Sequence, residues 1–153
     1  NALTNRTKTM KTTAATSPSA PKSREALRVL VVDDDLFQLE LNTDLLKGLG
    51  VTDITTANNG DLALQAIAKT SGSLGFHLML TNLHMPGMDG FQFMEAAARN
   101  GFKGALIIVS GQSTEVMRSA SLVAQLRRFK LLGTLTKPVV QTQLSSMLSK
   151  LVG

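Results

Sequence analysis

Five short apolar stretches alternate along this chain with segments whose apolar residues recur at helical spacing. The stretches are four to six residues long, a usual length for strands, and the segments between them repeat every three to four residues. The predicted strands cover residues 27–32, 53–57, 76–81, 105–109 and 133–136, and the predicted helices cover residues 36–49, 61–70, 91–100, 113–131 and 140–151. Such alternation predicts an α/β fold, a doubly wound five-stranded parallel sheet with helices on both faces.

The carboxyl ends of the predicted strands carry the polar residues that matter most. In a doubly wound sheet, ligands bind beyond these ends, at the point where the strand order reverses. The residues at this edge are Asp33, Asp34 and Asp35 after the first strand, Asn82 after the third, Ser110 after the fourth and Lys137 after the fifth. Topology alone therefore predicts that these side chains share one site.

The formal net charge of +5 lies mainly in the first residues of the chain. Five basic residues and one acidic residue fall within residues 1–26, a segment rich in Thr, Ser and Ala. We therefore predict a basic flexible tail or linker over residues 1–25 and one domain over residues 26–153. The tight basic group of Arg127, Arg128 and Lys130 is expected to be a solvated helix end, so no nucleic-acid partner is expected.

Composition excludes several classes of protein. The chain has no cysteine, so disulfides and thiolate chemistry are excluded. No apolar run approaches the roughly 20 residues of a membrane span, and no signal peptide is evident. A cytoplasmic protein without membrane contact is the expectation. His77 lies in a predicted strand and is expected to be a core or surface residue rather than a ligand.

Three consecutive aspartates at the end of a buried strand are unusual. Asp35 is predicted to cap the helix that follows. Two carboxylates about 5 Å apart repel each other by about 3–4 kcal/mol, so Asp33 and Asp34 are expected to serve a function. Clustered carboxylates commonly hold a hard cation such as Mg²⁺.

Four short motifs, in this order along the chain, are similar to those of the receiver domains of two-component response regulators. They are Val31-Val32-Asp33-Asp34, Met85-Pro86-Gly87-Met88-Asp89-Gly90, Ile108-Val109-Ser110-Gly111 and Thr136-Lys137-Pro138. The resemblance implies the flavodoxin-like receiver fold, with strand order 2-1-3-4-5.

The resemblance also implies roles for the residues at the strand ends. Asp33 and Asp34 would bind Mg²⁺ together with the main-chain carbonyl of His84. Ser110 would hydrogen-bond a phosphoryl oxygen and act as a switch position, while Lys137 would pair with the acidic site. The Lys137–Pro138 peptide bond would be cis.

The chain departs from the receiver pattern in three places. Asn82 stands where receivers carry the aspartate that accepts a phosphoryl group, and its neutral amide cannot form an aspartyl phosphate. An amide oxygen could still ligate Mg²⁺, but more weakly. Thr134 stands where receivers commonly carry an aromatic switch residue. The long interval from Ser110 to Lys137 resembles receivers joined to EAL-type cyclic-di-GMP phosphodiesterases.

The function expected from the resemblance is a signalling module that is not phosphorylated at Asn82. Asn82 could be natural, which makes the chain a pseudo-receiver, or an engineered substitution. Output would come from the fourth helix, fifth strand and fifth helix, through contact with a sensor kinase, an output domain such as an EAL phosphodiesterase, or a second copy of the chain. No catalysis is expected.

Two alternatives remain open. Asp33 and Asp35 resemble the nucleophile motif of haloacid-dehalogenase-type phosphatases, but residues 138–153 contain no Asp or Glu for the later acidic pair of that family. A nucleotide-binding flavodoxin-like module would need a glycine-rich phosphate loop, and none follows the first strand.

Overall fold

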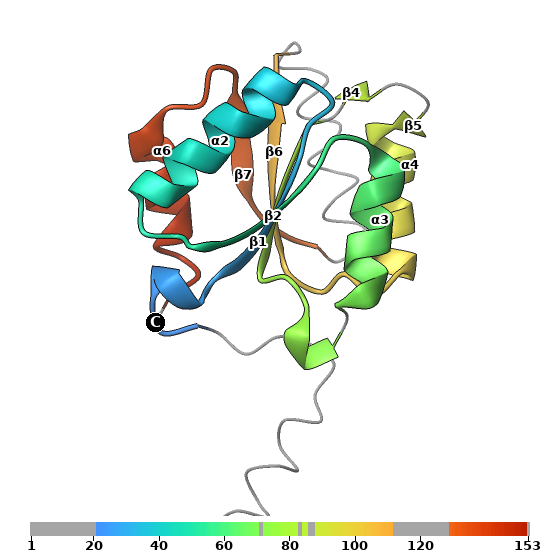
Figure 1. The fold of residues 1–153 in the computed structure, drawn as a ribbon, viewed down its shortest axis with the longest axis horizontal. Helices are drawn as coiled ribbons and strands as arrows, with labels where there is room; N and C mark the ends of the chain where they lie inside the picture. Colours follow the sequence, from blue (N-terminus) through green and yellow to red (C-terminus); the bar gives the residue numbers. More distant parts are fainter. Residues whose placement is uncertain (1–20, 71, 83, 86–87, 112–128, 153) are drawn as a thin grey trace, which may run out of the picture.

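The computed structural model describes residues 21–152 except residues 71, 83, 86–87 and 112–128. Five parallel strands form the central sheet in the order β2-β1-β3-β6-β7, as seen in Figure 1. These strands are β1 (Arg28–Val32), β2 (Asp53–Ala57), β3 (Leu78–Asn82), β6 (Ala105–Ser110) and β7 (Lys130–Thr136). Counted along the chain, this is the order 2-1-3-4-5, so the predicted fold is confirmed.

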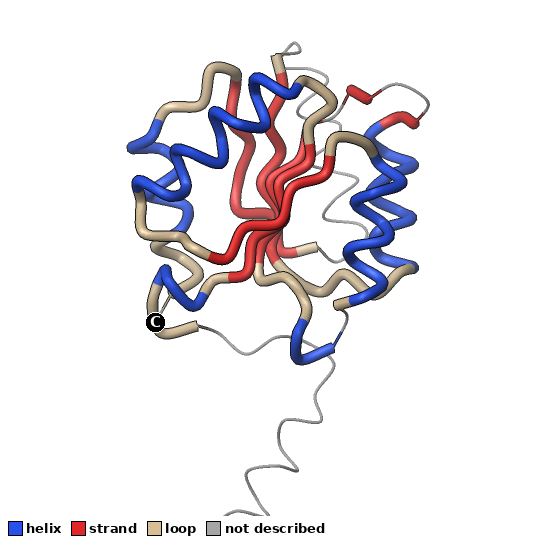
Figure 2. The backbone as a smooth tube through the Cα atoms, viewed as in Figure 1, coloured by secondary structure: helices blue, strands red, loops and turns tan. Residues whose placement is uncertain are grey.

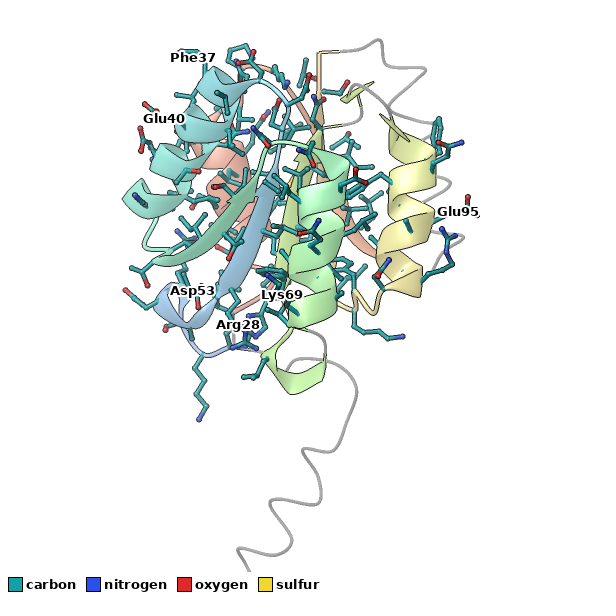
Figure 3. The ribbon with its side chains drawn as sticks, turned by 45° about the vertical axis from the view of Figure 1, so that its right-hand side comes forward. Arg28, Phe37, Glu40, Asp53, Lys69 and Glu95 are labelled. Atoms are coloured by element: carbon teal, nitrogen blue, oxygen red, sulfur yellow. The ribbon has the colours of Figure 1, made fainter. Side chains whose placement is uncertain are left out.

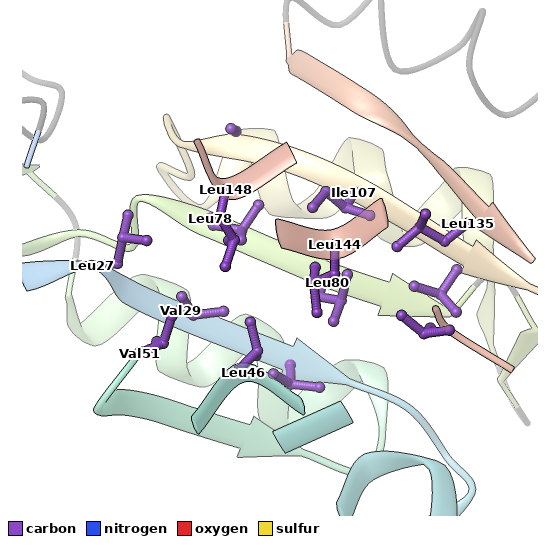
Figure 4. Close-up of a cluster of buried hydrophobic side chains, with 14 of the residues drawn as sticks. Leu27, Val29, Leu46, Val51, Leu78, Leu80, Ile107, Leu135, Leu144 and Leu148 are labelled. Atoms are coloured by element: carbon purple, nitrogen blue, oxygen red, sulfur yellow. The ribbon is translucent and has the colours of Figure 1, made fainter. Parts of the chain in front are cut away.

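The described helices cover both faces of the sheet (Figures 1 and 2). They are α2 (Leu36–Gly48), α3 (Gly60–Lys69), α4 (Gly90–Arg99) and α6 (Gln141–Leu148). Residues of α2 and α6 pack on one face with Val29 and Val31, and residues of α3 and α4 pack on the other with Leu30 and Val32. Figure 4 shows the first of these two cores, in which the leucines of α6 lie over the leucines of β3. Both faces are apolar because successive strand residues point to opposite sides.

The predicted cap at Asp35 is confirmed, and glycines follow two of the helices. Asp35 caps α2 and accepts hydrogen bonds from the backbone N–H groups of Phe37 and Gln38. Gly50 and Gly101 follow α2 and α4 with φ of 99° and 98°, a left-handed conformation that only glycine adopts readily. No helix in the described part of the chain is both long and apolar enough to cross a bilayer.

The last strand begins earlier than predicted. β7 starts at Lys130, whereas the sequence placed residues 129–131 in a helix and the strand at 133–136. The cause is a bulge: Leu106 pairs with Leu131 and Ile107 with Gly133, so Leu132 has no partner in the register. Leu131 packs with one core and Leu132 with the other, which a strand allows. The rest of the predicted fourth helix, residues 113–128, lies outside the described residues.

A short 3-10 helix, η1 (Arg24–Ala26), ties the start of the domain to its other elements. The guanidinium of Arg24 donates to the carbonyl oxygen of Leu49 at 3.1 Å and to the carbonyl oxygen and hydroxyl of Ser145 at 3.2 and 3.0 Å. It also reaches the hydroxyl of Ser149 at 3.2 Å. One side chain thus joins η1 to the ends of α2 and α6. The boundary between tail and domain at residue 25 stays a prediction, although Arg24 already contacts the domain.

His77 has a structural role in the described residues. It is 8% exposed, and its Nδ1 accepts the backbone N–H of Arg28 at 2.9 Å. Its own backbone N–H donates to the carbonyl oxygen of Arg28 at 2.8 Å. These bonds hold the segment before β3 against the start of β1, at the edge of the sheet opposite the strand carboxyl ends.

The inner face of α2 contains two polar side chains one turn apart. Asn42 is 2% exposed, and neither its Oδ1 nor Oε1 of Gln38 has a hydrogen-bond partner within the described residues. By contrast, Phe37 and Glu40 on the same helix point outward (Figure 3). A buried polar atom without a partner lowers stability.

Replacing Asn42 with leucine is therefore expected to raise the free energy of unfolding by about 1–2 kcal/mol, because leucine has the same branched shape and carries no polar atom that needs a partner. Urea unfolding followed by circular dichroism measures the change. Asp44→Leu, at an exposed position of the same helix, controls for helix propensity. A lower stability of Asn42→Leu would contradict this expectation and would show that the amide of Asn42 makes a hydrogen bond that stabilises the fold.

Candidate functional site

Four neighbouring strands bring the predicted site residues to one edge of the sheet. Asn82 ends β3, Ser110 ends β6, and Asp33 and Lys137 directly follow β1 and β7. Backbone hydrogen bonds hold the two flanking residues beyond the strands: the N–H of Asp33 donates to Ala57 O at 3.2 Å, and the N–H of Lys137 donates to Ser110 O at 3.1 Å. The parallel register thus continues into the site.

Asp33 is the buried centre of the site. Its side chain is 1% exposed, and its Oδ1 accepts the backbone N–H of Asp35 at 2.9 Å. Its Oδ2 lies 3.0 Å from Nζ of Lys137, whose side chain is 20% exposed. Within the described residues Oδ2 has no partner besides this ammonium group, so the lysine is what compensates its charge there. A buried carboxylate without such a partner would be strongly destabilising.

The amide of Asn82 lies against both acids. The residue is 7% exposed, and its Nδ2 donates to Oδ1 of Asp34 at 3.0 Å and to Oδ1 of Asp33 at 3.4 Å. The side-chain nitrogen of Asn82 therefore faces the carboxylates. The ligand expected from Asn82 was its amide oxygen, because the sequence contains no signal for the orientation of an amide.

The structure also describes Ser110, Thr134 and the peptide bond that follows Lys137. Ser110 is fully buried at the end of β6, beside the pocket residues. Thr134 is half-buried in β7 and pairs with Ile108. The peptide bond between Lys137 and Pro138 is cis.

The side chains of Thr81 and Asp35 make hydrogen bonds to the backbone instead of joining the pocket. Thr81 is 1% exposed, and its hydroxyl donates to the main-chain carbonyl oxygen of Asn82 at 3.1 Å. The carboxylate of Asp35 caps α2 and so does not join the other two acids.

The side chains as they lie do not fit a divalent cation. Mg²⁺ needs oxygen ligands in octahedral geometry. Two carboxylates converge here, but the third group between them presents N–H donors. Across the described residues, no three His, Asp or Glu side chains gather in a way that could hold a metal ion. His84 lies in the two-residue strand β4 (His84–Met85), which pairs with β5 (Met88–Asp89), and nothing further is described of its side chain.

Comparison with known proteins places this chain in one family and finds several relatives. The family described as response regulator receiver domain matches residues 29–149. A probable chemotaxis protein CheY of Rhizobium etli is 34% identical over 104 residues, covering 65% of this chain and 78% of that protein. The Vibrio cholerae chemotaxis protein CheY4 superposes with a TM-score of 0.67 at 21% identity, covering 82% of this chain and 98% of that one, which supports the fold.

Other relatives are much longer than this chain. The sensor histidine kinase GacS of Pseudomonas protegens is 30% identical over 145 residues, covering 92% of this chain but 15% of the kinase. The cyclic di-GMP phosphodiesterase RocR of Pseudomonas aeruginosa is 29% identical over 125 residues, covering 81% of this chain and 31% of that protein. None of these matches is to a haloacid dehalogenase, so the phosphatase alternative gains no support from them.

Proposed function

Because this chain belongs to the family of response regulator receiver domains, we propose that it is a two-component signalling module that is not phosphorylated at the position of Asn82. The observation that supports this most directly is the state of Asn82 itself. Its side chain is a neutral amide, buried and hydrogen-bonded to Asp33 and Asp34. The nitrogen lone pair of an amide is delocalised, so this group is a poor nucleophile toward a phosphoryl group.

The other pocket residues are those that phosphoryl chemistry would use. Phosphoryl transfer depends on positioning and charge neutralisation more than on covalent chemistry by the protein. Lys137 supplies a positive charge beside Asp33, and Ser110 supplies a hydroxyl at the end of the adjacent strand. The proposal is therefore a receiver pocket that retains these surroundings and lacks only the reacting carboxylate.

Mg²⁺ is the cation that receiver domains bind at their acidic pocket. In this chain Asp33 and Asp34, the amide of Asn82 and the main-chain carbonyl of His84 would be the groups toward it. We propose that Mg²⁺ binds weakly or not at all, because Asn82 carries one negative charge less than an aspartate and presents its nitrogen to the acids.

Protein contacts are the proposed means of action, since receiver domains generally act as signalling domains rather than enzymes. The proposed surface comprises β7, α6 and the predicted fourth helix. The partner would be a sensor kinase, an output domain or a second copy of the chain. The likeness to a cyclic di-GMP phosphodiesterase supports an EAL domain as one such output, and the cytoplasm is the proposed location.

The test is an attempt to phosphorylate the unmodified chain with acetyl phosphate and Mg²⁺, followed by intact mass spectrometry. We expect no gain of a phosphoryl group, because Thr81 is buried and its hydroxyl is hydrogen-bonded to the backbone. Stoichiometric label that peptide mapping places at the end of β3 would contradict the proposal, and label at any other residue would contradict the expectation that the pocket is the only place for an acceptor. The Asn82→Asp protein is the positive control.

A further inference from the structure

We infer that the side-chain amide of Asn82 takes the place of the divalent cation in this pocket, so that protein atoms alone hold its carboxylates together. The inference rests on the proposed function, since it concerns the same pocket. The pocket would then have one arrangement, which does not depend on metal, and metal binding would not regulate it.

The amide nitrogen of Asn82 lies within hydrogen-bonding distance of both carboxylates. Asp33 and Asp34 follow β1, and Asn82 reaches them from the neighbouring strand β3. One amide nitrogen carries two N–H groups, and it lies 3.0 Å from one carboxylate oxygen and 3.4 Å from the other. The amide thus joins two like charges through shared hydrogen bonds, as a cation would through shared coordination.

Neighbouring protein groups already compensate the negative charge of Asp33. Lys137 lies 3.0 Å from Asp33, and the backbone N–H of Asp35 donates to the same carboxylate. The remaining negative charge is on Asp34, which is exposed and therefore solvated by water. The pocket has little unbalanced charge with which to attract a divalent ion.

The amide and a divalent cation would compete for the same carboxylate oxygens. Mg²⁺ binds oxygen atoms at about 2.0–2.1 Å and tolerates little distortion of its octahedral geometry. The N–H groups of Asn82 point toward the carboxylate oxygens that such an ion would use. Binding would have to break both hydrogen bonds and turn the amide, so metal and the present arrangement exclude each other.

Thermal unfolding in EDTA and in excess Mg²⁺ tests the inference on three proteins. The unmodified chain is expected to unfold at the same temperature in both. Asn82→Asp is expected to unfold at a lower temperature in EDTA and to gain about 5 °C or more when Mg²⁺ reaches about 100 times its dissociation constant. Asn82→Ala, which is neutral but has no donor, is expected to unfold below the unmodified chain in both solutions.

Two results would overturn the inference. One is a Mg²⁺-dependent rise in the unmodified chain that matches the rise in Asn82→Asp. The other is an Asn82→Ala protein as stable as the unmodified chain, because the amide would then hold nothing together.

A second measurement needs only the unmodified chain, should the variants not fold. The side-chain amide resonance of Asn82 in ¹⁵N NMR spectra is expected to stay in place during a Mg²⁺ titration, and a saturable shift would refute the inference. Failure of the proposed function has a different signature, namely phosphoryl label on the unmodified chain. The two failures are therefore distinguishable.

Discussion

Asn82→Asp protein is expected to take up one phosphoryl group from acetyl phosphate in the presence of Mg²⁺, whereas the unmodified chain takes up none. The substitution replaces the amide NH₂ group at the end of β3 with a carboxylate oxygen and keeps the shape of the side chain. It supplies the carboxylate that receiver domains use as acceptor, beside Asp33, Ser110 and Lys137. Intact mass spectrometry measures the uptake, and loss of the label under alkaline hydroxylamine identifies it as an acyl phosphate.

A matched control is the double variant Asp33→Asn, Asn82→Asp. It has the same number of carboxylates in the pocket as the unmodified chain, but the buried acid that pairs with Lys137 is now neutral. We expect its labelling to fall by at least about 10²-fold, the size of effect typical for loss of one electrostatic group at a reacting centre. Full labelling of the double variant would mean that Asp33 is not part of the phosphoryl pocket. Absence of label on Asn82→Asp would mean that the pocket has diverged beyond one position.

Gly104→Ala is expected to lower the free energy of unfolding by about 3 kcal/mol, the upper part of the range for overpacking a rigid site. A Cβ at this position would lie against the carbonyl oxygen of Phe76 and 2.8 Å from the carbonyl carbon and oxygen of His77. These are backbone atoms of the segment before β3, which hydrogen bonds already fix to Arg28 and Ala105. The neighbouring strands would have to separate at the amino-terminal edge of the sheet. Urea unfolding of the variant gives the value.

Gly133→Ala provides the comparison for Gly104→Ala. Its Cβ would meet Cε and Sδ of Met147 at 2.5 and 3.3 Å, which are the far end of a flexible side chain. Because methionine can adopt another rotamer, the expected cost is below about 1 kcal/mol. Equal losses for the two variants would contradict the idea that backbone rigidity, rather than closeness alone, determines the cost.

Periodicity was sufficient to predict the α/β fold, and the topology of parallel strands was sufficient to predict the edge that carries the site, whereas the strand order followed from the resemblance to receiver domains. The apolar runs of β1 and β6 and the caps at Asp35, Gly50 and Gly101 each agree with the fold. These features are local, or follow from the rule that parallel strands end at the same edge, so a single sequence contains them.

Two features could not be predicted because they depend on atoms distant in sequence. The start of β7 at Lys130 depends on pairing with β6 across a bulge at Leu132, and the local pattern there is equally compatible with a helix. The orientation of the Asn82 amide depends on Asp33 and Asp34, which are 49 and 48 residues away. In both cases a tertiary contact determines what local propensity leaves undefined.

The hydrogen bonds of Arg24 also bear on how this domain could be tethered. They bring η1 to within side-chain reach of Ser149, so the polypeptide enters and leaves the described domain at the same corner (Figure 1). Two modules attached at residue 21 and at residue 152 would start from neighbouring points on the surface. A short linker at each end would then give the two modules a high effective concentration for each other, independent of any change inside the pocket.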